Sequence, residues 1–104
     1  MGSTRPRLLW DNEAIGIGET TEIVPCDGYS RKSVYFLTDT TGDITVEIDP
    51  DGGGTWITLF TEAGIGVRAA ANPWAFGTEF EFIYLRVTFS VAATVTCWVV
   101  TGVD

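Results

Sequence analysis

The fold of this chain is most clearly encoded in residues 44–60, which read Ile44-Thr45-Val46-Glu47-Ile48-Asp49-Pro50-Asp51-Gly52-Gly53-Gly54-Thr55-Trp56-Ile57-Thr58-Leu59-Phe60. Apolar residues alternate with polar ones on both sides of a centre that is rich in Asp and Gly. Alternation with a period of two is typical of a strand with one buried face, and Asp and Gly are residues that tight turns require. The stretch therefore predicts a β-hairpin that closes at residues 49–56.

The turn of this hairpin resembles the Asp-box, a recurrent turn written S/T-x-D-x-G-x-T-W/F. Asp51, Gly53, Thr55 and Trp56 fall on that pattern, whereas Asp49 stands where Ser or Thr is usual. We expect the carboxylate of Asp51 to accept hydrogen bonds from turn amides and Trp56 to pack beneath the hairpin. The resemblance implies a structural role, because the Asp-boxes of sialidase propellers lie far from the active site.

Further strands are predicted at residues 20–24, 33–38, 66–71, 79–89 and 94–101, separated by clusters of turn residues. The last two are predicted to form the strongest element of the core. No stretch has helical periodicity, and short strands that recur every 10 to 12 residues or so are typical of sandwiches and small barrels. The chain is therefore predicted to be an all-β protein, a small β-sandwich of jelly-roll or Ig-like type with about six to eight antiparallel strands.

The length of 104 residues is enough for one hydrophobic core. We expect a single β-sandwich domain at residues 11–104, preceded by an N-terminal arm at residues 1–10. The arm contains two arginines and the apolar triplet Leu8-Leu9-Trp10. Two interpretations remain open: the arm is a first strand packed on its own core, or it reaches another subunit.

Charge and hydropathy restrict the classes of partner. Fourteen acidic residues against six basic ones give a formal net charge of -8, which disfavours nucleic acid and anionic membrane surfaces by long-range repulsion. No apolar run approaches the roughly 20 residues that cross a bilayer, and the N-terminus lacks the apolar region of a signal peptide. The chain is expected to be soluble when free.

Catalytic, cofactor-binding and metal-binding residues are not predicted, and the protein is expected not to be an enzyme. The chain has no His, and no Ser or Cys stands in the setting of an activated nucleophile. Glu79 and Glu81 are interpreted as a solvated edge rather than a pair of catalytic carboxylates. Asp49 and Asp51 are interpreted as turn caps rather than Ca²⁺ ligands, because too few oxygen ligands stand near them.

The two cysteines, Cys26 and Cys97, permit a single disulfide. Cys97 alternates with Val95 and Val99 in an apolar strand, so a buried thiol is the favoured interpretation. A zinc site is excluded because two cysteines without any His cannot supply its ligands.

Surplus aromatic residues indicate an interface with other proteins, since Trp, Tyr and Arg carry much of the binding energy at such surfaces. Trp10 and Trp74 also leave open a carbohydrate-binding interpretation, because Trp56 is assigned to the hairpin and Trp98 to a core strand. The residues predicted to form the protein interface are Arg5, Arg7, Leu8, Leu9, Trp10, Trp74, Phe76, Phe82 and Tyr84.

The sequence pattern ends with the strand Tyr84-Leu85-Arg86-Val87-Thr88-Phe89 and its successor. Taken with the arm and the hairpin, this pattern resembles small all-β virion proteins of tailed bacteriophages and related viruses, such as capsid decoration proteins and tail or neck components. The resemblance implies a structural protein located in the virion, repeated by symmetry, that associates with itself and with a capsid or tail protein. Two alternatives stay open: a carbohydrate-binding or adhesion module, and a cellular surface-layer or filament subunit.

Overall fold

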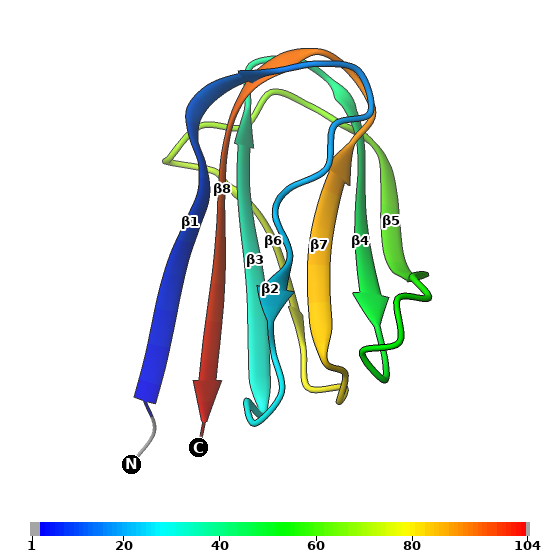
Figure 1. The fold of residues 1–104 in the computed structure, drawn as a ribbon. Helices are drawn as coiled ribbons and strands as arrows, with labels where there is room; N and C mark the ends of the chain where they lie inside the picture. Colours follow the sequence, from blue (N-terminus) through cyan, green and yellow to red (C-terminus); the bar gives the residue numbers. More distant parts are fainter. Residues whose placement is uncertain (1–2, 104) are drawn as a thin grey trace.

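The computed structural model describes residues 3–103, which form eight β-strands in two four-stranded sheets (Figure 1). We call the sheet with strand order β1-β8-β3-β6 sheet A, and the sheet with strand order β2-β7-β4-β5 sheet B. All paired strands are antiparallel. The strands are β1 (Ser3–Ile15), β2 (Val24–Pro25), β3 (Arg31–Thr38), β4 (Gly42–Asp49), β5 (Ile57–Ile65), β6 (Trp74–Thr78), β7 (Tyr84–Phe89) and β8 (Ala93–Val103).

The hydrophobic core lies between the two sheets, where alternate side chains of each strand point inward. Phe36 of sheet A packs on Phe89 of sheet B with their ring centroids 4.8 Å apart. The indole of Trp10 meets Phe36 edge-on with a centroid distance of 6.5 Å. The prediction of a small antiparallel β-sandwich is therefore confirmed.

Local strand predictions succeeded where alternation was strong. The hairpin at residues 44–60 is confirmed as β4 and β5, and residues 33–38 and 94–101 lie in β3 and β8. The strand predicted at residues 66–71 is wrong: in that range only Arg68 makes an isolated bridge, to Thr38. Three successive alanines in this segment have little tendency to form strands.

Two other predicted strands are shorter in the structure. Residues 20–24 contribute an isolated bridge at Thr20 and the start of the two-residue β2, and residues 79–89 form a strand only from Tyr84. The segment at 74–78, which carried no strand prediction, is β6. The last two predicted strands, at residues 79–89 and 94–101, do not pair with each other. The strand β7 pairs with β4 and β2 in sheet B, whereas β8 pairs with β1 and β3 in sheet A.

The predicted N-terminal arm is a strand of the sandwich, which is a correction. From Ser3 onward the segment lies in β1, which continues past residue 10 to Ile15 and pairs with β8. Trp10 has only 5% of its surface exposed and belongs to the core. The arm is held in place because this indole is buried and because β1 is hydrogen-bonded along β8, with Ser3 opposite Val103.

The turn between β4 and β5 is anchored by two carboxylates. Asp49, which is 2% exposed, accepts hydrogen bonds from the amides of Gly52 (3.0 Å) and Gly54 (2.9 Å). Asp51 is exposed and accepts one, from the amide of Gly53 at 2.9 Å. Turn capping by both acids agrees with the sequence prediction, but the principal anchor is Asp49, the position that departs from the Asp-box pattern. The Asp-box resemblance itself stays a prediction.

Trp56 does not pack beneath the hairpin as predicted. Its side chain is only partly buried, and it is absent from the core cluster. The guanidinium carbon of Arg86 instead lies 4.1 Å from the centroid of the indole ring, a cation–π contact on the outer face of sheet B. Thr55, the neighbouring position of the motif, is exposed.

Deletion of residues 1–10 is expected to unfold the domain, because it removes most of β1 and the buried indole of Trp10. The single change Trp10→Ala should lower the free energy of unfolding by about 3 to 5 kcal/mol. Circular dichroism with thermal melting measures both effects. Deletion of residues 1–4 is the matched control and should leave the melting temperature nearly unchanged. A ten-residue deletion that melts like the full chain would contradict the assignment of β1 to the core.

Replacement of Asp49 should destabilise the hairpin more than replacement of Asp51. Asp49→Ala removes a buried carboxylate that accepts hydrogen bonds from two turn amides, so we expect a loss of about 2 to 4 kcal/mol. Asp51→Ala removes one exposed bond and should cost about 1 kcal/mol or less. Asp49→Asn keeps the shape and one acceptor, and should fall between them. Urea denaturation provides the measurement, and an equal cost at the two acids would show that Asp49 is not the main anchor.

Candidate functional site

Three of the predicted interface residues are buried in the core, and this corrects the predicted surface. Trp10, Trp74 and Phe82 have 5%, 4% and 3% of their surfaces exposed. All three belong to the cluster of buried residues that forms the hydrophobic core. These residues therefore cannot contact a partner in the folded domain, and Trp10 and Trp74 cannot serve as a carbohydrate platform.

Trp74 is held by contacts within the molecule. Its ring lies beside two phenylalanine rings, with centroids 6.4 Å from Phe60 and 6.2 Å from Phe76, and Phe60 and Phe76 stack on each other at 4.9 Å. The indole nitrogen donates a hydrogen bond to Glu62 Oε1 at 3.1 Å. Because Phe60 and Glu62 belong to β5 and Trp74 and Phe76 to β6, this cluster joins the edge strands of the two sheets.

The other predicted interface residues lie at or near the surface but do not form one patch. Leu8 is 45% exposed and points away from the core, whereas Arg5 and Arg7 lie opposite the inward-facing Thr101 and Val99 of β8. Leu9 is partly buried against the core, and Tyr84 is a half-buried residue at the start of β7 in sheet B. The predicted set is thus divided among three surfaces.

The outer face of sheet A carries an apolar surface that the sequence did not single out. Leu8, Trp98, Tyr35 and Ala75 stand directly opposite one another on four adjacent strands, so their side chains form one row across the sheet. Tyr35 is 38% exposed and Trp98 is partly exposed. A second row, parallel to the first, consists of Pro6, Val100, Ser33 and Gly77.

A shallow hollow of about 260 Å³ adjoins the centre of the first row. Tyr35 and Trp98 form one side of it, and Leu37 lies beside them on β3. Ala70 and Pro73, from the segment between β5 and β6, complete the wall. Its lining residues include no charged side chain, so the hollow fits apolar groups. We call the two rows and this hollow the outer face of sheet A.

The outer face of sheet B is polar, in contrast. Arg86 Nε donates to Glu47 Oε1 at 3.1 Å, and the Thr88 hydroxyl donates to the same oxygen at 3.2 Å. The hydroxyls of Thr45 and Thr61 lie within hydrogen-bonding distance, 3.2 Å apart, on the directly paired strands β4 and β5. A sheet face of this composition is satisfied in water. The two faces of the sandwich therefore differ sharply in polarity.

Both cysteines are free, buried thiols, and the single disulfide is excluded. Burial raises the pKa of Cys97 to about 12. Burial also raises the pKa of Cys26 to about 11, although Lys32 and Arg7 act in the opposite direction. Since the thiolate is the reactive form, neither side chain is a nucleophile at neutral pH.

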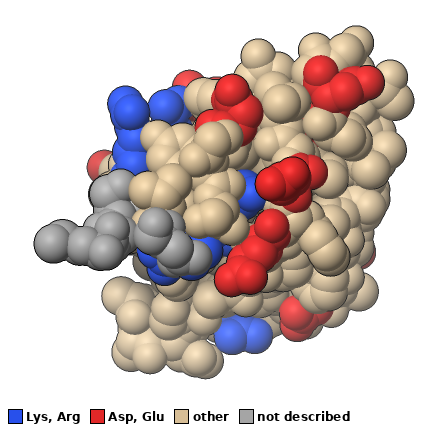
Figure 2. All heavy atoms as spheres, turned by 90° about the horizontal axis from the view of Figure 1, so that it is seen from below, with Lys and Arg blue, Asp and Glu red and all other residues tan. Residues whose placement is uncertain are grey.

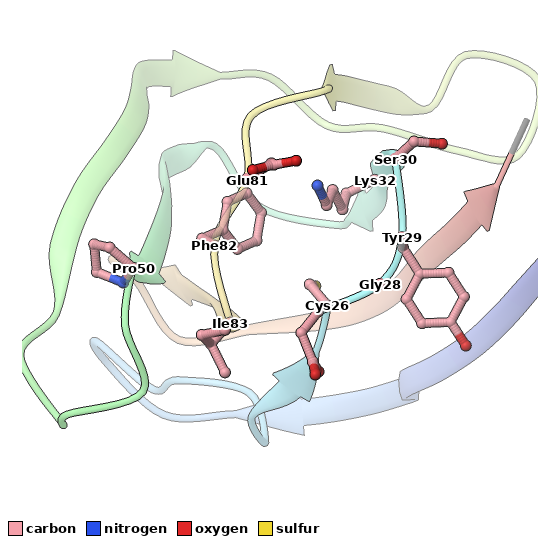
Figure 3. A pocket seen from close by; sticks show the side chains of 10 residues that line it. Cys26, Gly28, Tyr29, Ser30, Lys32, Pro50, Glu81, Phe82 and Ile83 are labelled. Carbon is pink, nitrogen blue, oxygen red and sulfur yellow. The ribbon is translucent and has the colours of Figure 1, made fainter.

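Lys32 is a buried cation that the sequence interpretation missed. It is 2% exposed, because it shares the inner face of β3 with Val34 and Phe36. This alternation in the sequence is a signal that could have identified it. Its ammonium group donates to the carbonyl of Phe80 and lies 4.8 Å from the ring centroid of Phe82. Figure 3 shows both side chains directed into a hollow of about 580 Å³ at this end of the sandwich.

Within residues 3–103, no group of three His, Cys, Asp or Glu side chains is placed to hold a metal ion. The same part of the chain contains no helix long and apolar enough to cross a membrane.

Comparison with known proteins gives a fold and no family. No protein-family model and no curated protein matches the sequence. Among solved structures, the chain is similar to the SPBc2 prophage-derived protein YomS, with a TM-score of 0.68 and 13% identity over 98% of this chain and 95% of that one.

Two further solved structures share the fold. A subunit of Bacillus endospore appendages, which are disulfide-linked pili, has a TM-score of 0.53 and 17% identity over 98% of this chain and 84% of that one. The K2 cleaved adhesin domain of Lys-gingipain has a TM-score of 0.56 and 11% identity over 93% of this chain and 68% of that one. At such low identity these likenesses establish a shared β-sandwich fold and leave the activity to be argued from the surface.

Proposed function

We propose that this protein is a non-enzymatic structural subunit of a virion, which works as one copy of a repeated assembly and contacts another copy through the outer face of sheet A. The observation that carries the proposal is the apolar row of Leu8, Trp98 and Tyr35 across that face. Large contiguous apolar surfaces are uncommon on monomeric proteins and mark sites of association.

Three of the four edge strands, β1, β2 and β6, are poor sites for association, which favours a face. The edge strand β1 carries Pro6, and its register is interrupted between Leu8 and Trp10 and again before Glu13. Proline and bulges protect an edge strand from pairing with another chain. The edge strands β2 and β6 have only two and five residues. An added strand would find few regular backbone partners at these three edges.

Charge favours a second copy of this chain as the occupant of the face. Two molecules with a net charge of -8 repel each other unless the contact excludes acidic residues. The two rows on the outer face of sheet A contain no acidic residue. A self-complementary contact there buries aromatic and aliphatic groups without bringing carboxylates together.

Carbohydrate binding is less well supported by the same surface. Tyr35 and Trp98 are exposed neighbours, as a sugar platform would need, but the adjoining hollow is lined by Leu37, Ala70 and Pro73. Sugar hydroxyls need hydrogen-bonding partners, and these side chains offer none. An apolar protein surface is the better match.

Placement in a virion is supported by the likeness of fold to the prophage-derived protein YomS. The cellular alternative, a filament subunit, is supported by the weaker likeness to the endospore appendage pilus. Quantitative mass spectrometry of virus-like particles from the host that carries the gene distinguishes the two. We expect the protein in many copies per particle. Absence from such particles would overturn the virion assignment.

Self-association is tested by sedimentation velocity over a range of concentrations. We expect the unmodified chain to form oligomers. The double variant Tyr35→Lys with Trp98→Lys should associate at least about tenfold more weakly. The matched control is Thr45→Lys with Thr61→Lys, an equivalent cross-strand pair on the outer face of sheet B. It should associate like the unmodified chain. A chain that stays monomeric at every concentration, or two double variants that behave alike, would overturn the proposal.

A further inference from the structure

A small basic pocket lies between β1 and β2, apart from the outer face of sheet A. Arg5 and Arg7 are two residues apart on β1, so both side chains leave the strand on the same side, about 7 Å apart at their origins. That side belongs to the inner face of sheet A, because their partners on β8 are the buried Thr101 and Val99. Arg5 itself is exposed and Arg7 is partly buried.

The pocket exists because sheet B does not cover this corner of sheet A. Its edge strand β2 has only two residues and is followed directly by the turn that carries Tyr29. The resulting space has a volume of about 280 Å³. Two guanidinium groups and the hydroxyl-bearing Tyr29 and Thr101 stand around an apolar floor of Val24 and Val99.

Among the residues that the structure describes, the two arginines have no acidic partner, although the protein is strongly acidic. Arg86 is paired with Glu47, but neither Arg5 nor Arg7 makes an ion pair or a side-chain hydrogen bond within residues 3–103. Seen from the end of the molecule that carries both termini, Lys and Arg side chains gather toward the termini, and most of the visible acidic side chains lie on the other side (Figure 2). Basic side chains are thus concentrated on one side of this end of the molecule.

A simpler explanation of inward-pointing charges on an edge strand is that they prevent aggregation, without binding any ligand. That role explains the presence of positive charge on β1, but it needs neither an enclosed space nor an apolar floor. Tyr29 lines both this pocket and the Lys32 and Phe82 hollow, and Figure 3 shows its ring pointing away from the side chains of Lys32 and Phe82. The phenol is therefore available to a group bound beside Arg5 and Arg7.

We propose that this pocket binds the C-terminal carboxylate of an extended partner peptide, whose last side chain is apolar. Guanidinium groups match a carboxylate geometrically and bind it through paired hydrogen bonds. The Tyr29 hydroxyl donates a further bond, and the last side chain of the peptide lies on Val24 and Val99. A single carboxylate is compatible with the net charge of -8, whereas a polyanion is repelled. The site does not rest on the proposed role in a virion.

The test is a heteronuclear NMR titration of the full chain with a short acetylated peptide that ends in valine. We expect saturable shifts of the amides of Arg5, Arg7, Tyr29 and Thr101. The same peptide with an amidated C-terminus should bind at least about tenfold more weakly, because it lacks the charge-assisted bonds. Inorganic phosphate, as a general anion, should cause weaker shifts at the same amides.

Variants separate the pocket from general attraction to positive charge. Arg5→Gln with Arg7→Gln should weaken the binding of the peptide with a free C-terminal carboxylate by about tenfold or more, while leaving the melting temperature of the protein unchanged. Tyr29→Phe removes one hydroxyl and should weaken the binding of this peptide by a smaller factor. Arg68→Gln is the matched control at the far end of the molecule and should have no effect. Equal binding of the acid, the amide and phosphate, or equal effects of Arg68→Gln and the double variant, would overturn the proposal.

Discussion

The structure depends on the pairing of β8 with both β1 and β3. This one strand is hydrogen-bonded on both sides, so it sets the register of sheet A. Register in a sheet determines the face to which each side chain belongs, because side chains alternate strictly along a strand. The burial of Cys97 and the exposure of Trp98 are two results of the same pairing, and so is the alignment of Trp98 with Leu8 and Tyr35.

The sequence predicted what is local and periodic. The hairpin of β4 and β5 was recognised because its alternation and its turn lie within one short stretch, and the all-β class follows from the same pattern repeated. The turn acids were identified as well, although the relative weights of Asp49 and Asp51 were not. Burial determines those weights, and it depends on segments distant in sequence, such as Ile83, whose amide donates a hydrogen bond to the carbonyl of the buried Asp49.

The candidate surface was predicted less well, because it is formed by strands that are distant in sequence. Leu8 and Trp98 are 90 positions apart and become neighbours only through sheet A. The orientation of Trp98 could nevertheless have been predicted from the sequence. Once Cys97 is assigned to an inward face, alternation requires Trp98 to face outward. Trp10 could not be treated in this way, since irregular register around it interrupts the alternation of β1.

Chain order has a consequence for how this sandwich forms. The strand β1 leaves the ribosome before all other described strands, and its only partner, β8, leaves after them. During synthesis the apolar residues of β1, including Trp10, stay unpaired and exposed until β8 has been made. Closing such a distant pair is entropically costly and therefore slow. The domain consequently completes its core only after β8 has been synthesised. Pro6, Arg5 and Arg7 lie on the strand that stays unpaired for longest, where they hinder premature pairing with other chains.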